Sequence, residues 1–483
     1  MEKDLNKKAV TAGMWYIVSI FLIRGISFIT TPIFSRILTE AQLGNVKTFE
    51  SWMYLFTPIM ALSMYDSIAR AKYDHENDYN QYISSVQTLN ILFTCAVFLI
   101  SIPFYSTVSK LLDMSLPVYL TFFLYLLSHP SVLYMQNREK QLLNYKSNIL
   151  ISALMSLPPT LIALALIFIF KKSGSTALDE ARIIGMFIPQ AIVGFVIIIL
   201  LYKKGHTFIN LKYWKYALKF SLPLIPYALS VIILNQSNLL MIKASNGETV
   251  AGLYSLAVTI VYIVELLSDS IINAWEPWAY ENMNAGNYKP IKKAWLGISC
   301  IYGGISFLII MFAPELIWVL GGEKYASAVY VVPPLITGTV LYFLCRGCIK
   351  AELFYKKTFL ASVGTIIAAA LNVALNYYFL FVKGFDYKIA AYSTAFCYLM
   401  LLAVHAIFTK LIEKKQISIS TGMTFVTGIV FIVLNLSAQL LYSKTAYIRY
   451  VIVVALFIIA FVLFRKKIPL AINYVKGFLK KNK

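Results

Sequence analysis

The sequence predicts an all-α protein that crosses a membrane many times. Of its 483 residues, 59% are hydrophobic and only 13% are charged, whereas soluble domains average about 25% charged residues. Its apolar runs are long and continuous, unlike the alternating strands of about ten residues found in membrane barrels. Helices also satisfy their own backbone hydrogen bonds within lipid.

We expect about fourteen transmembrane helices, because a helix of about 20 mostly apolar residues crosses a bilayer. The apolar runs that we interpret as spans are residues 10–34, 49–69, 84–105, 117–134, 148–170, 183–202, 219–242, 251–273, 294–313, 328–345, 358–381, 389–409, 421–442 and 446–464.

The basic residues predict the orientation of these spans. With the N-terminus inside, 30 of the 43 Lys and Arg residues fall in inner segments and 12 in outer segments. The positive-inside rule then places both termini in the cytoplasm. The net charge of +21 is therefore mainly a topology signal that also attracts anionic membrane lipids. No basic soluble domain exists to bind nucleic acid.

The spans divide into two pseudo-symmetric lobes of six helices, with two helices added at the C-terminus. We expect an N-terminal lobe at 1–202, a cytoplasmic amphipathic linker at 203–218 and a C-terminal lobe at 219–409. Residues 410–483 then hold the last two spans and a basic cytoplasmic tail.

A weak internal repeat supports two related lobes. An offset of 208 residues aligns Glu40–Gly44 with Glu248–Gly252, and each segment follows the first span of its lobe. Transporters often contain such repeats. Pro223 and Pro226 open the seventh span and are hinge candidates, because proline removes a helix hydrogen bond and bends the axis. Ordinary use of proline in membrane helices is the alternative.

A cation lies in the middle of the first span. Arg24 has no acidic residue in its run, and a charge at that depth costs roughly 2.5–3.5 kcal/mol on insertion scales. Ser27 and Thr31 share its helix face through the i, i+3, i+7 spacing. Guanidinium binds phosphate oxygens in a bidentate manner, so we interpret this face as an anion-binding site. A buried ion pair with a distant carboxylate is the alternative.

Two carboxylates share one face of the eighth span. Glu265 and Asp269 are four residues apart, and two carboxylates this close can share a proton. They are candidates for ion coupling, and the alternative makes one of them a structural partner of Arg24 or Arg70.

Amide side chains gather in the seventh and eleventh spans. Asn235 and Asn238 form one group, and Asn372 and Asn376 form another. Such amides either bridge helices or bind sugar hydroxyls as part of a substrate site. His129 and His405 are interpreted as packing residues.

The sequence carries no signature of an enzyme. It lacks H-E-x-x-H, Walker A and G-x-S-x-G motifs, and Cys345 and Cys348 lack the second pair that a metal site needs. We therefore expect no enzymatic activity, no cofactor and no metal site. Energy for transport would come from an ion gradient, the membrane potential or a partner protein.

Several of these residues together resemble the Wzx-type polysaccharide flippases, which belong to the multidrug/oligosaccharidyl-lipid/polysaccharide (MOP) exporter superfamily. The N-terminal group consists of Gly13, Trp15, Arg24, Pro32, Arg36, Leu38, Thr39 and Gly44. The later groups are Ser221–Pro226, Ala251–Ser255, Asn273–Trp278 and the Asn372/Asn376 pair. Asn235–Asn238 departs from the family, which commonly has an acidic and a basic residue there.

The resemblance implies two helix bundles around a central cavity that opens alternately to each side of the bacterial cytoplasmic membrane. The implied substrate is a sugar or oligosaccharide on polyprenyl pyrophosphate, flipped from the inner to the outer leaflet for O-antigen or capsule synthesis. Arg24 would hold the pyrophosphate, and polysaccharide polymerase or ligase machinery would be a partner. The alternatives are a multidrug exporter of the same superfamily and a membrane-embedded polysaccharide polymerase.

Overall fold

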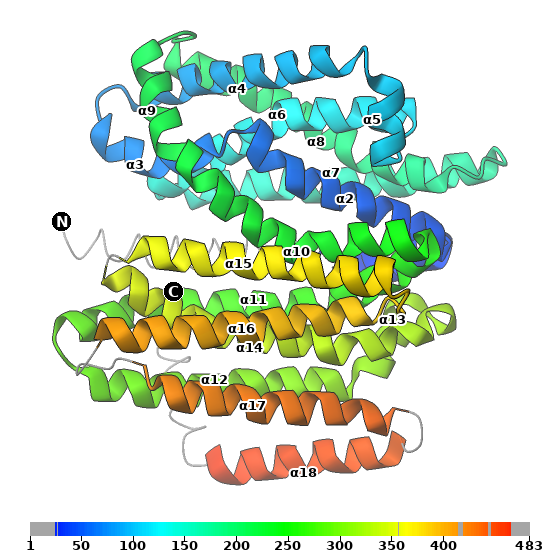
Figure 1. Ribbon diagram of the computed structural model, residues 1–483. Helices are drawn as coiled ribbons and strands as arrows, with labels where there is room; N and C mark the ends of the chain where they lie inside the picture. Colours follow the sequence, from blue (N-terminus) through cyan, green and yellow to red (C-terminus); the bar gives the residue numbers. More distant parts are fainter. Residues whose placement is uncertain (1–24, 27, 356, 414–418, 443–445, 465–483) are drawn as a thin grey trace, which may run out of the picture.

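The computed structural model describes residues 25–26, 28–355, 357–413, 419–442 and 446–464, so Arg24 and Ser27 lie outside it. The regular elements in these ranges are helices, and most of them lie side by side in one bundle (Figure 1). Eleven of these helices are long and apolar enough to cross a membrane by length and composition. The expected all-α, multi-pass membrane architecture is confirmed, while the number of about fourteen spans stays a prediction.

The first half of the chain forms helices that run from the first span to the predicted linker. They are residues 28–37, α2 (Glu40–Met60), a 3-10 turn (Met64–Asp66), α3 (Ser67–Asp74), α4 (Tyr79–Ser101), α5 (Tyr105–Leu112), α6 (Leu116–Gln141), α7 (Tyr145–Lys172), α8 (Leu178–Gly205) and α9 (Leu211–Ser221).

The second half begins with a 3-10 turn at Leu222–Leu224. Its helices are α10 (Ile225–Asn246), α11 (Glu248–Asn284), α12 (Tyr288–Met311), α13 (Ala313–Gly321), a 3-10 helix (Glu323–Val331), α14 (Val332–Phe354), α15 (Thr358–Asn376), a π-helical segment (Tyr377–Val382), α16 (Ile389–Glu413), α17 (Thr421–Ala438), a 3-10 turn (Gln439–Leu441) and α18 (Ala446–Phe464).

The second membrane helix begins earlier than hydropathy predicts. We expected a span at 49–69, but α2 starts at Glu40. Thr39 caps it, because its hydroxyl accepts a hydrogen bond from the Gln42 backbone at 3.2 Å and the Gln42 side chain accepts one from the Thr39 backbone at 3.0 Å. This reciprocal cap fixes a helix start within a polar stretch, and α2 therefore carries Lys47 and Glu50 in its interior.

Each half of the chain has its own buried apolar core. Two clusters in the first half draw on residues 34–187 and 64–217, and one large cluster in the second half draws on residues 234–453 with Leu43 added. Figure 1 shows the blue and cyan helices stacked above the yellow and orange ones. The linker helix α9 packs into the first half through Tyr213 and Ala217.

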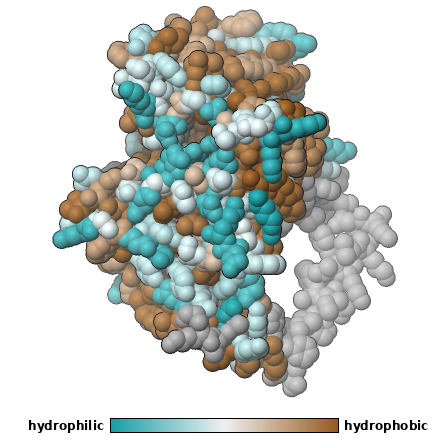
Figure 2. Space-filling view, turned by 90° about the vertical axis from the view of Figure 1, so that its right-hand side faces the viewer, coloured by the Kyte–Doolittle hydropathy of each residue, from teal (hydrophilic) through white to brown (hydrophobic). Residues whose placement is uncertain are grey.

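We call the end of the bundle that carries Asp113, residues 173–177 and Gly247 the outer end, after the orientation that the basic residues predict. Figure 2 views the molecule from the right-hand side of Figure 1, where these connections lie. Hydrophilic side chains gather in a band across the middle of this face, with hydrophobic side chains above and below it.

Candidate functional site

Of the predicted anion-binding face, the structure describes Thr31. Thr31 lies on the helix of residues 28–37 and is 8% exposed, so its side chain is buried within the protein. Arg24 and Ser27 lie outside the described residues, and their anion-binding role stays a prediction.

Polar side chains of α2, α10 and α11 meet where the two halves contact each other. The Ser51 hydroxyl on α2 donates to Gln236 on α10 at 3.0 Å. Tyr262 of α11 lies close to Gln236 and to Glu50 of α2. Glu50 also forms an ion pair with Lys47 at 2.7 Å. The sequence patterns did not single out Glu50, although a carboxylate inside an apolar run is a signal for a functional position.

The two carboxylates of α11 have different surroundings. Asp269 forms an ion pair with Arg346 of α14 at 2.7 Å, and the same guanidinium donates to Ser268 at 3.0 Å. A partner of Asp269 is thus Arg346, whereas the sequence predicted Arg24 or Arg70. Glu265 is half-buried and lies near Tyr262 and other tyrosine side chains. The geometry brings neither carboxylate into a metal cluster, and the described residues hold no group of three potential metal ligands of the His, Cys, Asp or Glu type.

Three of the four predicted amides form one buried network between α10, α15 and α16. Asn238 donates to Thr394 at 2.7 Å, Asn376 donates to Asn238 at 2.6 Å, and Asn372 donates to Thr394 at 3.2 Å. These amides are at most 2% exposed. This arrangement favours the helix-bridging interpretation. Asn235 is exposed and accepts a hydrogen bond from Tyr398 at 2.9 Å.

Two glycines bring α2 and α11 into backbone contact at the outer end. A Cβ added to Gly252 would lie 1.9 Å from the Glu40 carbonyl oxygen, and one added to Gly44 would lie 2.1 Å from the Glu248 carbonyl oxygen. These positions belong to the two segments of the internal repeat. Only glycine permits so close an approach. The two segments that the internal repeat aligns are therefore in direct contact with each other.

Further contacts close the same end. Ser35 donates to the Leu320 carbonyl, and Lys324 donates to the Leu38 carbonyl at 2.8 Å. Lys243 on α10 forms an ion pair with Asp113 of the first half at 2.5 Å. These contacts join the two halves, so the outer end is closed.

An acidic cavity of about 260 Å³ lies beside this ion pair. The carboxylates of Asp113, Asp179, Glu180 and Glu248 line it together with the Lys243 ammonium. Glu248 lies 3.7 Å from Lys243, which therefore has one carboxylate partner in each half of the molecule.

Arg182 is a buried basic residue of α8. We expected it in an outer connection, but it lies inside α8 and is 7% exposed. Its guanidinium stacks on the Phe34 ring at 3.7 Å. Within the part of the chain that the structure describes, its Nε and Nη1 atoms have no hydrogen-bond partner.

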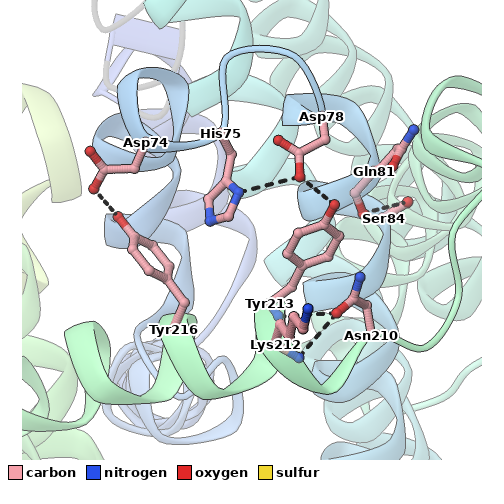
Figure 3. Close-up of polar contacts among 9 residues, drawn as sticks. All are labelled: Asp74, His75, Asp78, Gln81, Ser84, Asn210, Lys212, Tyr213 and Tyr216. Carbon is pink, nitrogen blue, oxygen red and sulfur yellow. Dashed lines mark hydrogen bonds and ion pairs between the residues drawn. The ribbon is translucent and has the colours of Figure 1, made fainter.

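Aromatic and acidic side chains anchor the linker helix α9 to the first half (Figure 3). Tyr213 of α9 donates to Asp78, and Tyr216 donates to Asp74 at 2.7 Å. The His75 ring stacks on Tyr82 and contacts both α9 tyrosines edge to face, with ring centres 5.0–5.2 Å apart. The Tyr216 hydroxyl, followed by the Arg70 guanidinium, lowers the pKa of Asp74, and the Tyr213 hydroxyl lowers the pKa of Asp78.

The helix axis breaks directly after this anchor. Pro223 lies in the 3-10 turn between α9 and α10, and Pro226 lies in the first turn of α10. Proline suits both places because its missing N–H is not needed there. Their role as a hinge stays a prediction.

Comparisons with curated proteins find two relatives at low identity. The chain is 23% identical over 384 residues to "Lsg locus putative protein 1" of Haemophilus influenzae, covering 75% of this chain and 90% of that protein. It is also 23% identical to an "Uncharacterized membrane protein" of the same organism, covering 68% of this chain and 81% of the relative.

Solved structures show a similar fold. The structure titled "Lipid II flippase MurJ, inward closed conformation" matches with a TM-score of 0.65 at 14% identity, covering 95% of this chain and all of that one. An inward-facing multidrug resistance MATE family transporter of the MOP superfamily matches with a TM-score of 0.58 at 13% identity, covering 90% of this chain and all of that one. The profile of the family described as "Polysaccharide biosynthesis protein" matches residues 10–283. Because this match spans more than half of the sequence, the chain belongs to the polysaccharide biosynthesis protein family, and it has the fold of MOP-superfamily transporters.

Proposed function

We propose that this protein is a flippase that moves a polyprenyl-pyrophosphate-linked sugar or oligosaccharide from the inner to the outer leaflet for surface polysaccharide synthesis. It works by alternating access in the bacterial cytoplasmic membrane, with both termini in the cytoplasm. Residues 1–202 and 219–409 act as the two lobes, 203–218 as the linker, and 410–483 as an addition to the second lobe.

The observation that carries this proposal is the closed outer end between two separately packed halves. A protein whose halves have their own cores can move them against each other with little loss of buried apolar surface, since repacking within a core is what costs most. The Gly44–Gly252 crossing and the Lys243–Asp113 ion pair are confined to one end. Separating them would open that end and would remove only Leu43 from the second-half core.

Arg24 binds the pyrophosphate in this proposal, with Ser27 and Thr31 on the same helix face as hydroxyl donors. Glu265 and Asp269 stay candidates for ion coupling, and Asp269 is neutralised by Arg346 in this conformation. Asn235 is the amide best placed for a sugar, because it is exposed, whereas Asn238, Asn372 and Asn376 stabilise the second lobe. Pro223 and Pro226 form the hinge.

The direct test is flipping of a fluorescent polyprenyl-pyrophosphate disaccharide by the full chain in proteoliposomes. Wild-type protein should expose the lipid in the opposite leaflet. The Arg24→Ala variant should insert normally but flip the lipid at least about tenfold more slowly, because a charge-assisted hydrogen bond is worth about 1.5–3 kcal/mol. Arg24→Lys keeps the charge without the bidentate geometry and should be intermediate.

Three outcomes would contradict the proposal. Full activity of Arg24→Ala would remove the phosphate role. Export of cationic drugs without lipid flipping would instead indicate a multidrug exporter, and chain elongation by the purified protein would indicate a polymerase.

A further inference from the structure

The acidic cavity at the outer end lies between the two halves and takes no part in the proposed function. The first half contributes the carboxylates of Asp113, Asp179 and Glu180, and the second half contributes Glu248 and the Lys243 ammonium. Four carboxylates and one ammonium leave an excess of three negative charges. The side chains of Asp113 and Glu248 are 62% and 42% exposed, so the cavity is accessible to water from the outer side.

Neutral oxygen atoms of α2 belong to the same lining. Asn45 and Thr48 are three residues apart on α2, and both line the cavity. Thr48 is 5% exposed, and neither its hydroxyl oxygen nor the amide oxygen of Asn45 has a hydrogen-bond partner among the described residues. The Asn45 amide nitrogen is engaged, because it donates to Asp179 at 2.9 Å. Buried polar atoms are usually satisfied, so these two oxygen atoms indicate a ligand that donates hydrogen bonds.

A cation that keeps its water shell is such a donor. Carboxylate, amide and hydroxyl oxygens all accept hydrogen bonds, and the water molecules on a cation point their hydrogen atoms outward. The described part of the chain holds no group of three His, Cys, Asp or Glu side chains able to bind one ion directly, so water must lie between the ion and most of the carboxylates. Mg²⁺ suits this arrangement, because it dehydrates reluctantly and usually keeps several waters.

The size of the cavity agrees with a hydrated ion. Six water molecules at about 30 Å³ each occupy about 180 Å³, and the cavity measures about 260 Å³. No sequence motif marks this set of ligands, because its carboxylates come from three separate segments of the chain.

Stabilisation of helix ends explains only part of this arrangement. Asp179 and Glu180 lie in the first turn of α8, and Glu248 lies in the first turn of α11, where carboxylates interact favourably with the helix dipole. That role does not require the carboxylates of the two halves to share one cavity. It also does not account for Asp113, which follows α5, or for the unsatisfied oxygen atoms of α2.

We propose that the acidic cavity binds one hydrated divalent cation of the Mg²⁺ type from the outer side and that this ion holds the outer end closed. Closure brings the first-half carboxylates towards Glu248, and their mutual repulsion opposes it. The ion offsets this repulsion, so it binds the closed arrangement more tightly than the open one and shifts the population towards closure. Lys243 supplies part of the same compensation through its two carboxylate partners. The ion stays at the outer end and is not transported.

Binding is measured on the purified full chain in a neutral detergent, with Mn²⁺ as the probe. Free Mn²⁺ gives a six-line electron paramagnetic resonance signal that weakens when the ion binds. Mg²⁺ and hexaamminecobalt(III) serve as competitors, and the cobalt complex binds only through its intact ammonia shell. Closure is measured as the distance between spin labels at Ser173 of the first half and Lys383 of the second half, which are both exposed.

The cavity is tested with the double variant Asp179→Asn with Glu180→Gln. It removes two carboxylates from the cavity and leaves both ion pairs of Lys243 in place. The matched control is Glu323→Gln with Asp386→Asn, which removes two carboxylates that do not line the cavity from connections at the same end of the bundle.

A single variant tests the neutral oxygen atoms. Thr48→Val removes the hydroxyl and leaves a side chain of similar shape, so it should fold as the wild type does. Its affinity for Mn²⁺ should fall several-fold, because one acceptor for the water shell is lost.

We expect the wild type and the control variant to bind Mn²⁺ at a site from which both Mg²⁺ and hexaamminecobalt(III) displace it. The double variant should bind at least about tenfold more weakly, because hydrogen bonds to charged groups are lost. At a Mg²⁺ concentration of about ten times its Kd, the open population of the wild type should fall about tenfold relative to NaCl of equal ionic strength. The double variant should not respond to Mg²⁺.

The proposal is overturned if the double variant and the control bind Mn²⁺ equally well, or if hexaamminecobalt(III) does not compete. An unchanged distance distribution of the wild type in Mg²⁺ would overturn the closing role. If the double variant does not fold, an unchanged Mn²⁺ affinity of Thr48→Val overturns the site. None of these measurements uses a lipid substrate, so failure of the flippase assignment and failure of the cation site are separate results.

Discussion

At the scale of single residues, the outer end depends on two positions that tolerate no side chain. A Cβ at residue 252 would lie 1.9 Å from a backbone carbonyl oxygen, which cannot move as a flexible side chain could. Gly252→Val should therefore hold the outer end open, because overpacking costs about 1–3 kcal/mol. Accessibility of an introduced cysteine at Asn45 to a membrane-impermeant maleimide would report this opening. Gly297→Val is the matched control, since nothing lies within 4 Å of its added Cβ, and equal labelling of the two variants would contradict the prediction.

Lys243 is a second single residue on which closure of the outer end depends, because its ammonium can pair with either of two carboxylates. It lies between Asp113 of the first half and Glu248 of its own half, so we expect opening of the outer end to leave the ammonium paired with Glu248 alone. Asp113→Asn should increase the open population about 1.4- to five-fold, which corresponds to the roughly 0.2–1 kcal/mol of a partly exposed ion pair. Glu248→Gln should favour closure instead.

Spin labels on the two halves would measure both shifts as distance distributions. High salt should open the wild type but leave Asp113→Asn unchanged, because salt screens the ion pair that this variant lacks. Identical salt responses would show that the ion pair does not hold the outer end closed.

At the scale of elements, the linker helix α9 is an extension of the first half. The tyrosine hydroxyls that lower the pKa values of Asp74 and Asp78 bond α9 to the α3–α4 connection. A carboxylate whose pKa is lowered in the folded state stabilises the fold at pH values above its unfolded-state pKa of about 3.9. This contribution is lost as the pH falls through the folded-state pKa. We expect α9 to stay docked down to about pH 4 and to detach below it.

Hydrogen exchange of the α9 peptides measures this docking. Tyr213→Phe with Tyr216→Phe removes the bonds that lower the two pKa values, so the α9 peptides should exchange faster than in the wild type at neutral pH, and this difference should shrink as the pH falls below about 4. Tyr73→Phe is the control, because Tyr73 is 73% exposed on the neighbouring helix α3. The anchor assignment fails if the double variant and the wild type exchange alike at every pH.

At the scale of the whole molecule, the proposed alternating-access cycle predicts that the two halves separate at the outer end. Asp113 and Lys243 are each replaced by cysteine and joined by a short bismaleimide, and this cross-link should stop flipping. The background has Cys95 and Cys300 replaced by serine, since these two thiols are not buried. Each single-cysteine variant treated with the same reagent should stay active. A fully cross-linked protein that still flips lipid would exclude opening at this end.

The sequence by itself determined the class of fold and much of its layout. The long apolar runs required membrane helices, because no other structure satisfies the backbone in lipid except a closed barrel, and α4, α7, α12 and α17 lie where these runs predict. The repeat at Glu40 and Glu248 also marked two segments that proved to be in contact. Helix starts were less predictable, because caps such as Thr39 act within polar stretches that hydropathy assigns to loops.

Only the tertiary structure decided which polar groups meet. Glu352 and His405 are 53 residues apart, Asp269 and Arg346 are 77 apart, and Lys243 and Asp113 are 130 apart. Local spacing predicts contacts within one helix face, whereas these pairs depend on how helices pack against one another. A buried charge must find a partner within a few ångströms, and in this bundle the partner comes from whichever helix the packing brings alongside.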